Sequence, residues 1–164
     1  MNNKVIILTG EIQTGKTTLL QQFCRQRNDV AGILTPVVNG KRVFYDIAGK
    51  NSFSMEASGD EDSIPIGKYV FSVAAFAKAN NILLSAVAHN DCKYLIIDEI
   101  GPLEIKQQKG LYQSLNKIPG SSFNYNLIIV VRQSLVDEAL KTFALGNAEV
   151  LTLASMKKRF ESRC

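Results

Sequence analysis

The chain has 164 residues, of which 46% are hydrophobic and 21% are charged, and its 19 basic and 15 acidic side chains give a net charge of +4. This length accommodates one globular domain, over residues 1–164, and the composition is too apolar for a disordered chain. No apolar run approaches the roughly 20 residues of a membrane span, and the N-terminus lacks the features of a signal peptide, so we expect a cytoplasmic protein with no membrane segment.

The start of the chain predicts a strand, a glycine turn and a helix. Residues 4–9 form a β-branched run that ends at Gly10, a pattern typical of a strand buried on both faces. Residues 16–27 then carry leucine and phenylalanine at helical spacing among glutamine and arginine. This spacing indicates an amphipathic helix.

Short strands are expected next. Residues 30–38 and 42–48 flank Asn39-Gly40, a pair that tolerates the positive φ angles of a two-residue type I′ turn. These segments therefore predict an antiparallel hairpin. Residues 49–56 favour a third strand, and an acidic loop follows them.

The rest of the chain alternates predicted helices with predicted strands. The helices are expected over residues 71–89, over residues 103–117, and from a capping box at Ser134 and Asp137 to about residue 142. The strands are expected over residues 94–98, 127–131 and 149–153. Continuous apolar strands that alternate with helices need crossover connections, so the fold class is α/β, with a mainly parallel β-sheet flanked by helices and an inserted β-hairpin.

A phosphate-binding loop connects the first predicted strand to the first helix. The pattern G-x-x-x-x-G-K-[ST] is filled by Gly10, Glu11, Ile12, Gln13, Thr14, Gly15, Lys16 and Thr17. In such a loop the backbone N–H groups and the helix N-terminus face phosphate oxygens. Lys16 is expected to reach the β- and γ-phosphates, Thr17 to bind Mg²⁺, and Thr18 to donate to a further phosphate. The sequence thus predicts a site for a nucleoside triphosphate (NTP) with Mg²⁺ as cofactor.

Two carboxylates are candidates for the other half of this site. A phosphate-transfer site needs a carboxylate at the C-terminal end of a neighbouring buried strand, and Asp98 ends such a strand. We expect Asp98 to hold Mg²⁺ through water, because this ion dehydrates reluctantly. Glu99 follows at once and, by the alternation of a strand, should point to a different side. It is our candidate for the general base that deprotonates a water, and the alternative is a surface or helix-capping residue.

The remaining sulfur-bearing and basic residues indicate no second site. The cysteines Cys24, Cys92 and Cys164 are widely spaced and form no C-x-x-C pair, which argues against a disulfide framework and a zinc site. The basic residues 157–159 are interpreted as a solvated last turn. The small basic excess gives little reason to expect a nucleic-acid partner.

Three parts of the sequence together resemble the THEP1 family of nucleoside-triphosphatases, over most of the chain. They are the phosphate loop, residues 31–35 with the hairpin after them, and residues 97–104, which contain an Asp-Glu-Ile-Gly signature. The resemblance implies a P-loop NTPase fold with a RecA-like sheet. It also implies Mg²⁺-dependent hydrolysis of several NTPs, ATP and GTP among them, to a nucleoside diphosphate and phosphate.

The same resemblance carries roles onto single residues. Lys16 and Glu99 become the catalytic pair, and Asp98 serves the metal. Lys68, in a Gly-Lys-Tyr segment, and Glu104 enter only through the resemblance, and each could otherwise be an ordinary surface residue. The arginine-rich hairpin of the family is reduced here to Arg42.

Alternatives stay open at this point. Arg132 ends the third buried strand, where it could stabilise charge at the γ-phosphate or be a solvated strand end. A small nucleotide or metabolite kinase would share the loop, but kinases need an acceptor pocket and an arginine-bearing lid, for which this short chain leaves little room. A nucleotide-dependent switch or adaptor is the non-enzymatic alternative, although it would not require the pair Asp98 and Glu99. The oligomeric state is not predicted by any of these features.

Overall fold

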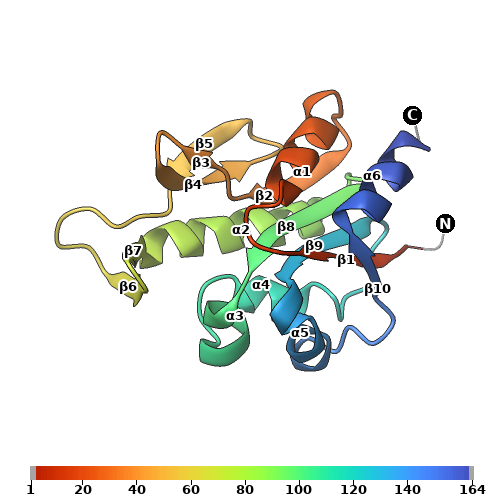
Figure 1. Cartoon of the computed structure of the whole chain (residues 1–164). Helices are drawn as coiled ribbons and strands as arrows, with labels where there is room; N and C mark the ends of the chain where they lie inside the picture. Colours follow the sequence, from red (N-terminus) through yellow and green to blue (C-terminus); the bar gives the residue numbers. More distant parts are fainter. Residues whose placement is uncertain (1–2, 163–164) are drawn as a thin grey trace.

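The computed structural model describes residues 3–162, which form one layered α/β unit around a central sheet (Figure 1). The strand order is β10-β1-β9-β8-β2-β4-β3, with β5 paired to β4, and the five strands from β10 to β2 run parallel. These eight strands are β1 (Val5–Gly10), β2 (Val30–Leu34), β3 (Val37–Val38), β4 (Lys41–Asp46), β5 (Asn51–Ser54), β8 (Tyr94–Ile100), β9 (Asn126–Arg132) and β10 (Glu149–Thr152). The predicted α/β class with a mainly parallel sheet is confirmed.

Within residues 3–162, six helices cover the two faces of the sheet. They are α1 (Lys16–Arg25), α2 (Val73–His89), α3 (Pro102–Gln107), α4 (Tyr112–Lys117), α5 (Val136–Thr142) and α6 (Leu153–Glu161), with a 3₁₀ turn over Gln133–Leu135. Helices α1 and α6 pack on one face, and α2 to α5 pack on the other (Figure 1). The continuous hydrophobic runs of the parallel strands place apolar side chains on both faces of the sheet, and the helices bury both faces.

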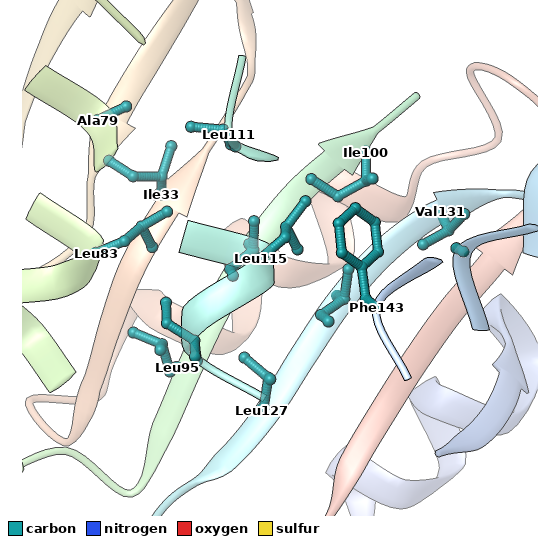
Figure 2. Packing of buried hydrophobic residues seen from close by; sticks show 14 of the residues in the cluster. Ile33, Ala79, Leu83, Leu95, Ile100, Leu111, Leu115, Leu127, Val131 and Phe143 are labelled. Atoms are coloured by element: carbon teal, nitrogen blue, oxygen red, sulfur yellow. The ribbon is translucent and has the colours of Figure 1, made fainter. Parts of the chain in front are cut away.

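The alternating side chains of the central strands divide the core into two halves. In β8, Leu95 and Ile97 face α2 and α4, whereas Ile96 faces α1 and α6, and all three are fully buried. Figure 2 shows the first half, in which Leu95 lies beside Leu115 of α4 and Leu127 of β9. This two-sided packing holds the C-terminal ends of β1, β8 and β9 in a fixed arrangement.

The turn at Asn39-Gly40 and the antiparallel hairpin around it are confirmed. Asn39 and Gly40 have φ angles of 51° and 75°, and they join β3 to β4 in antiparallel register. The segment before the turn forms two short strands, and both pair antiparallel with β4: β2 at Ile33 and Leu34, and β3 at Val37 and Val38. The other edge of β2 pairs in parallel with β8, which joins the hairpin to the main sheet.

Two expectations about helices were wrong. The single helix expected over residues 103–117 is two helices, because Gln108 and Gly110 adopt φ angles of 53° and 62° and interrupt it. The expected capping box does not form: the chain leaves β9 directly into the 3₁₀ turn, Ser134 lies inside that turn, and α5 begins with no side-chain cap.

A second hairpin, which the sequence did not predict, follows the acidic loop. It consists of β6 (Ser63–Ile66) and β7 (Tyr69–Ser72), which pair antiparallel as a separate two-stranded sheet. Gly67, with a φ angle of 57°, and Lys68 form its tip. A proline at position 65 hid the first of these strands, because proline is rare inside sheets and tolerated in an edge strand such as this one.

Membrane helices, metal clusters and cysteine pairs can be checked over the residues that the structure describes. No helix within residues 3–162 is long and apolar enough to cross a membrane. Over the same residues, no three His, Cys, Asp or Glu side chains cluster as a metal site. Cys24 and Cys92 are free thiols, and Cys164 lies outside the described residues. The cytoplasmic location stays a prediction.

Candidate active site

The phosphate loop takes the conformation that its glycines allow. Gly10 at the end of β1 has a φ angle of 154°, and Gly15, the residue before α1, has a φ angle of 95°. The ammonium group of Lys16 lies inside the curl of the loop, where it donates to the carbonyl of Gly10 at 3.2 Å and to that of Glu11. Thr14 also donates to the Glu11 carbonyl, at 2.9 Å. The loop therefore presents a positive charge and backbone N–H groups at the N-terminus of α1.

Asp98 on β8 is joined directly to the loop. One carboxylate oxygen, Oδ2, accepts hydrogen bonds from the Thr17 hydroxyl at 2.8 Å and from the Thr35 backbone N–H at 3.0 Å. The other oxygen, Oδ1, is buried and has no hydrogen-bond partner among residues 3–162. Burial raises the pKa of Asp98 from 3.8 to about 6, although the hydrogen bonds from Thr35 and Thr17 oppose that rise.

These groups fit a divalent cation. A hydroxyl and a carboxylate are the oxygen donors that a hard cation prefers, and the free Oδ1 atom is a buried acceptor that a metal-bound water would satisfy. A nearby positive charge would also compensate the buried negative charge of Asp98. The residues present therefore fit the cation site expected from the sequence, in which Thr17 would be a direct ligand and Asp98 a partner through water.

The sheet order corrects one expectation about Asp98. We expected this carboxylate on a strand next to β1, but β9 lies between β1 and β8. The end of β9 is Arg132, which pairs in register with Gly10. Arg132 therefore lies between the phosphate loop and the carboxylates at the C-terminal edge of the sheet, where ligands of parallel α/β sheets bind.

Glu99 does not point to a different side from Asp98. Pairing between β8 and β9 shifts register between Ile97 and Ile100, and Glu99 adopts a left-handed φ angle of 61°. This bulge removes the strand alternation on which the expectation rested. Both carboxylates approach the Thr35 hydroxyl, which lies 3.2 Å from Asp98 Oδ2 and 3.0 Å from Glu99 Oε2 and can donate its one proton to only one of them at a time.

Arg42 on β4 is a site residue that the sequence reasoning did not assign. Its guanidinium forms an ion pair with Glu99 Oε2 at 2.5 Å and lies over the ring of Tyr69, 5.4 Å from its centroid. Burial alone would lower the pKa of Arg42, but the hydrogen bond and charge of Glu99 outweigh it, so the pKa lies above its ordinary value. Thr35 was also missed. The only signal for either was the resemblance of residues 31–35 and of the hairpin to the THEP1 family.

The predicted residues converge on one open cleft of about 450 Å³. Its lining includes the predicted residues Ile12, Gln13, Thr14, Gly15, Lys16, Thr17, Thr18, Asp98, Glu99 and Arg132. It is also lined by Thr35 and Pro36 of the β2–β3 connection, by the exposed Val37 of β3 and by Arg42. Gly10 and Glu11 lie at the base of the loop and hold Lys16.

Lys68 and Glu104 do not line this cleft. Lys68 lies at the tip of the β6–β7 hairpin, with its ammonium group 5.2 Å from the Tyr69 ring centroid. Glu104 is no surface residue, since it is only 4% exposed, and its carboxylate accepts from the N–H groups of Gly101 at 3.1 Å and Leu111 at 3.2 Å. Burial raises the pKa of Glu104 to about 7. Its role is to join the start of α3 to the α3–α4 connection.

Comparisons with known proteins agree with this geometry. The family model described as NTPase matches residues 5–159. Nucleoside-triphosphatase THEP1 of Archaeoglobus fulgidus is 27% identical, over 84% of this chain and 85% of its own length. The THEP1 protein of Methanocaldococcus jannaschii is 28% identical, over 86% and 98%. The crystal structure of THEP1 from the hyperthermophile Aquifex aeolicus has a TM-score of 0.68 at 24% identity, covers 98% of this chain and 96% of its own, and shows the fold.

Proposed function

This chain belongs to the NTPase family, whose curated relatives are nucleoside-triphosphatases, and from that premise we propose that it hydrolyses ATP, GTP and other NTPs with Mg²⁺ as cofactor. The observation that carries the proposal is the convergence of three groups on one cleft. They are the Lys16 ammonium, the hydrogen-bonded pair of Thr17 and Asp98, and the carboxylate of Glu99. Together they supply phosphate binding, a cation site and a base, which are the parts that NTP hydrolysis needs.

The phosphate chain is held by the loop. Backbone N–H groups of the loop and the Lys16 ammonium bind the β- and γ-phosphate oxygens, with Thr18 donating from the first turn of α1. Thr17 would hold Mg²⁺ directly, and Asp98 would hold it through a bound water. When bound, the ion neutralises negative charge on the phosphate oxygens.

Glu99 directs the attacking water. Its carboxylate accepts a proton from the water as the water oxygen bonds to the γ-phosphorus, and the bond from that phosphorus to the bridging oxygen of the diphosphate breaks. Thr35 and Arg42 position the carboxylate through the contacts at 3.0 and 2.5 Å. Arg132, at the C-terminal edge of β9, is placed to stabilise the charge that develops on the transferred group.

A phosphate-release assay tests this proposal. Purified protein with Mg²⁺ is expected to release phosphate from each of ATP, GTP, CTP and UTP without any acceptor, because the cleft presents backbone groups to the phosphates rather than a base-reading motif. Chelation of the cation with EDTA is expected to abolish release, and restored Mg²⁺ to recover it. Release that persists at the same rate in EDTA would overturn the assignment of Thr17 and Asp98 to the metal. Absence of release from all four NTPs would overturn the hydrolysis itself.

A further inference from the structure

Tyr69 belongs to the β6–β7 hairpin, outside the main sheet, and it contacts the arginine that holds the proposed base. The guanidinium carbon of Arg42 lies 5.4 Å from the centroid of the Tyr69 ring, within the roughly 6 Å of a cation–π contact. The same guanidinium forms the ion pair with Glu99 at 2.5 Å. Tyr69, Arg42 and Glu99 therefore form one series of contacts that ends at the base.

The Tyr69 ring is itself held by the core. It stacks on Phe71 with ring centroids 5.6 Å apart and planes 8° apart, and Phe71 meets Phe76 of α2 edge to face at 5.9 Å. Phe71 and Phe76 are both buried. The backbone of the hairpin is anchored as well, since the Ser72 N–H donates to the Met55 carbonyl at 2.8 Å. A ring that is held in this way offers the guanidinium a fixed surface.

The surroundings of Arg42 strengthen its contact with the ring. Burial lowers the pKa of Arg42, whereas its contacts with Glu99 and, to a smaller extent, with Tyr69 raise it. The Arg42 side chain is only 18% exposed, so little water competes for its donors. Because a cation–π contact gains strength as the cation loses water, the position and the burial of Arg42 both favour the contact with Tyr69.

Other acceptors lie near Arg42, and the ring restricts which of them it reaches. A cavity of about 110 Å³ lies behind Glu99, and its lining includes Arg42, Tyr69 and the carboxylates of Asp98, Glu99 and Glu104. A polar space of this size has room for water and for a side chain that moves into it. A guanidinium that left Glu99 would find two other carboxylates there. The Tyr69 ring occupies the wall beside Arg42 and so favours the pair with Glu99.

We propose that Tyr69 is a positioning residue for hydrolysis: it holds the Arg42 guanidinium against Glu99 and thereby fixes the direction of the base. The inference rests on the proposed function, because Glu99 is the base in that reaction. Tyr69 lines the cavity behind Glu99 and does not line the phosphate cleft, so it acts without touching the phosphates. A small misplacement of a catalytic group is enough to lower a rate. The β6–β7 hairpin therefore contributes to turnover and not to substrate binding.

Substitutions of Tyr69, alone and combined with Arg42→Ala, test this role. Tyr69→Phe keeps the ring, Tyr69→Leu keeps apolar volume without a ring, and Tyr69→Ala removes both. Tyr112→Ala is the matched control, because the Tyr112 ring also lies beside a phenylalanine ring, at 5.8 Å, but lines neither the phosphate cleft nor the cavity behind Glu99. Phosphate release from ATP with Mg²⁺ gives kcat and KM, and circular dichroism shows that each variant is folded.

Tyr69→Ala and Tyr69→Leu are expected to lower kcat by about 5-fold with KM nearly unchanged, whereas Tyr69→Phe should stay within about 2-fold of the unaltered protein. Tyr112→Ala should leave kcat unchanged. In the Arg42→Ala background, Tyr69→Leu should lower kcat no further, because Tyr69 acts through Arg42. The same loss in both backgrounds would show an independent structural effect and overturn the inference. An unchanged kcat in Tyr69→Leu, or a change in KM alone, would also overturn it.

A second readout does not depend on hydrolysis. Nitrogen-15 NMR of the free protein detects arginine side chains, and the signal that Arg42→Ala removes belongs to Arg42. Hydrogen bonding to Glu99 slows rotation of the guanidinium, so its terminal N–H groups should give resolved signals in the unaltered protein and in Tyr69→Phe, and lose them in Tyr69→Leu. Signals that persist in Tyr69→Leu would overturn the inference. Absence of phosphate release from the unaltered protein would overturn the proposed function, while loss of these signals in Tyr69→Leu would still support the hold of Tyr69 on Arg42.

Discussion

The substitution Asp98→Asn should make the free protein more stable, relative to the unaltered protein, as the pH rises, while it removes activity. Asp98 is 1% exposed, and the hydrogen bonds that its side chain accepts all reach Oδ2, whereas Oδ1 has no partner among the described residues. An asparagine can place its amide oxygen at the Oδ2 position and keep those bonds from Thr17 and Thr35. The substitution removes the buried negative charge, but it leaves the amide NH₂ at the Oδ1 position without an acceptor, at a cost of about 1–3 kcal/mol that does not depend on pH.

The size of the effect follows from the pKa of Asp98, which burial raises from 3.8 to about 6. At roughly 1.4 kcal/mol per pH unit, this rise corresponds to about 3 kcal/mol of unfolding free energy. Between pH 4 and pH 6 the folded protein retains a proton that the unfolded chain has lost. The free energy of unfolding of the unaltered protein therefore falls across this window, relative to that of Asp98→Asn. Above pH 6 the difference between the two proteins approaches its full value.

Urea denaturation followed by circular dichroism at pH 4, 5, 6, 7 and 8 measures this difference, since the chain has no tryptophan for fluorescence. The stability of Asp98→Asn relative to the unaltered protein should grow by about 2.5 kcal/mol between pH 4 and pH 8, because a small part of the difference is already present at pH 4. At pH 8, Mg²⁺ with ATP should reduce the stability difference between the two proteins. The ligand stabilises the unaltered protein more than Asp98→Asn, because only the unaltered protein has the carboxylate. An advantage that is constant with pH would refute the reasoning about the buried charge.

Three further substitutions test other parts of the site and fold. Lys16→Ala should lower kcat/KM for ATP by about 100-fold or more, because it removes the charge at the phosphates; an unchanged value would contradict the loop assignment. Arg42→Ala should lower kcat about 10-fold with KM nearly unchanged, because it positions Glu99 rather than substrate; a change in KM alone would assign it to binding. Gly32→Ala places a Cβ atom 2.0 Å from a carbonyl oxygen of β8, so thermal unfolding should shift down by about 10 °C, whereas Gly146→Ala, with open space around it, should show no comparable loss.

Features that depend on neighbours in the sequence were predictable. The phosphate loop from Gly10 to Thr17 is one continuous motif, and the buried strands that flank it are continuous apolar runs. Asp98 was identified because it ends such a run. In each case the local backbone requirement, a curled loop or an extended buried strand, is written in adjacent residues.

Features that depend on pairing between distant segments were not predictable from one sequence. The bulge that turns Glu99 toward the cleft arises from the register of β8 against β9, which no local pattern encodes. The ion pair of Arg42 with Glu99 joins residues 57 positions apart, and Thr35 reaches both carboxylates only because β2 pairs with β8. The insertion of β9 between β1 and β8 is likewise a property of the sheet order.

The most direct test of the central claim is the variant Glu99→Gln in a single-turnover assay with ATP and Mg²⁺. A glutamine keeps the shape of the side chain and an oxygen for Thr35 and Arg42, but it cannot take a proton from water. Phosphate release is predicted to fall by about 100-fold or more, while the affinity for ATP, measured separately by titration, stays close to that of the unaltered protein. Release at the unaltered rate would contradict the assignment of Glu99 as the general base.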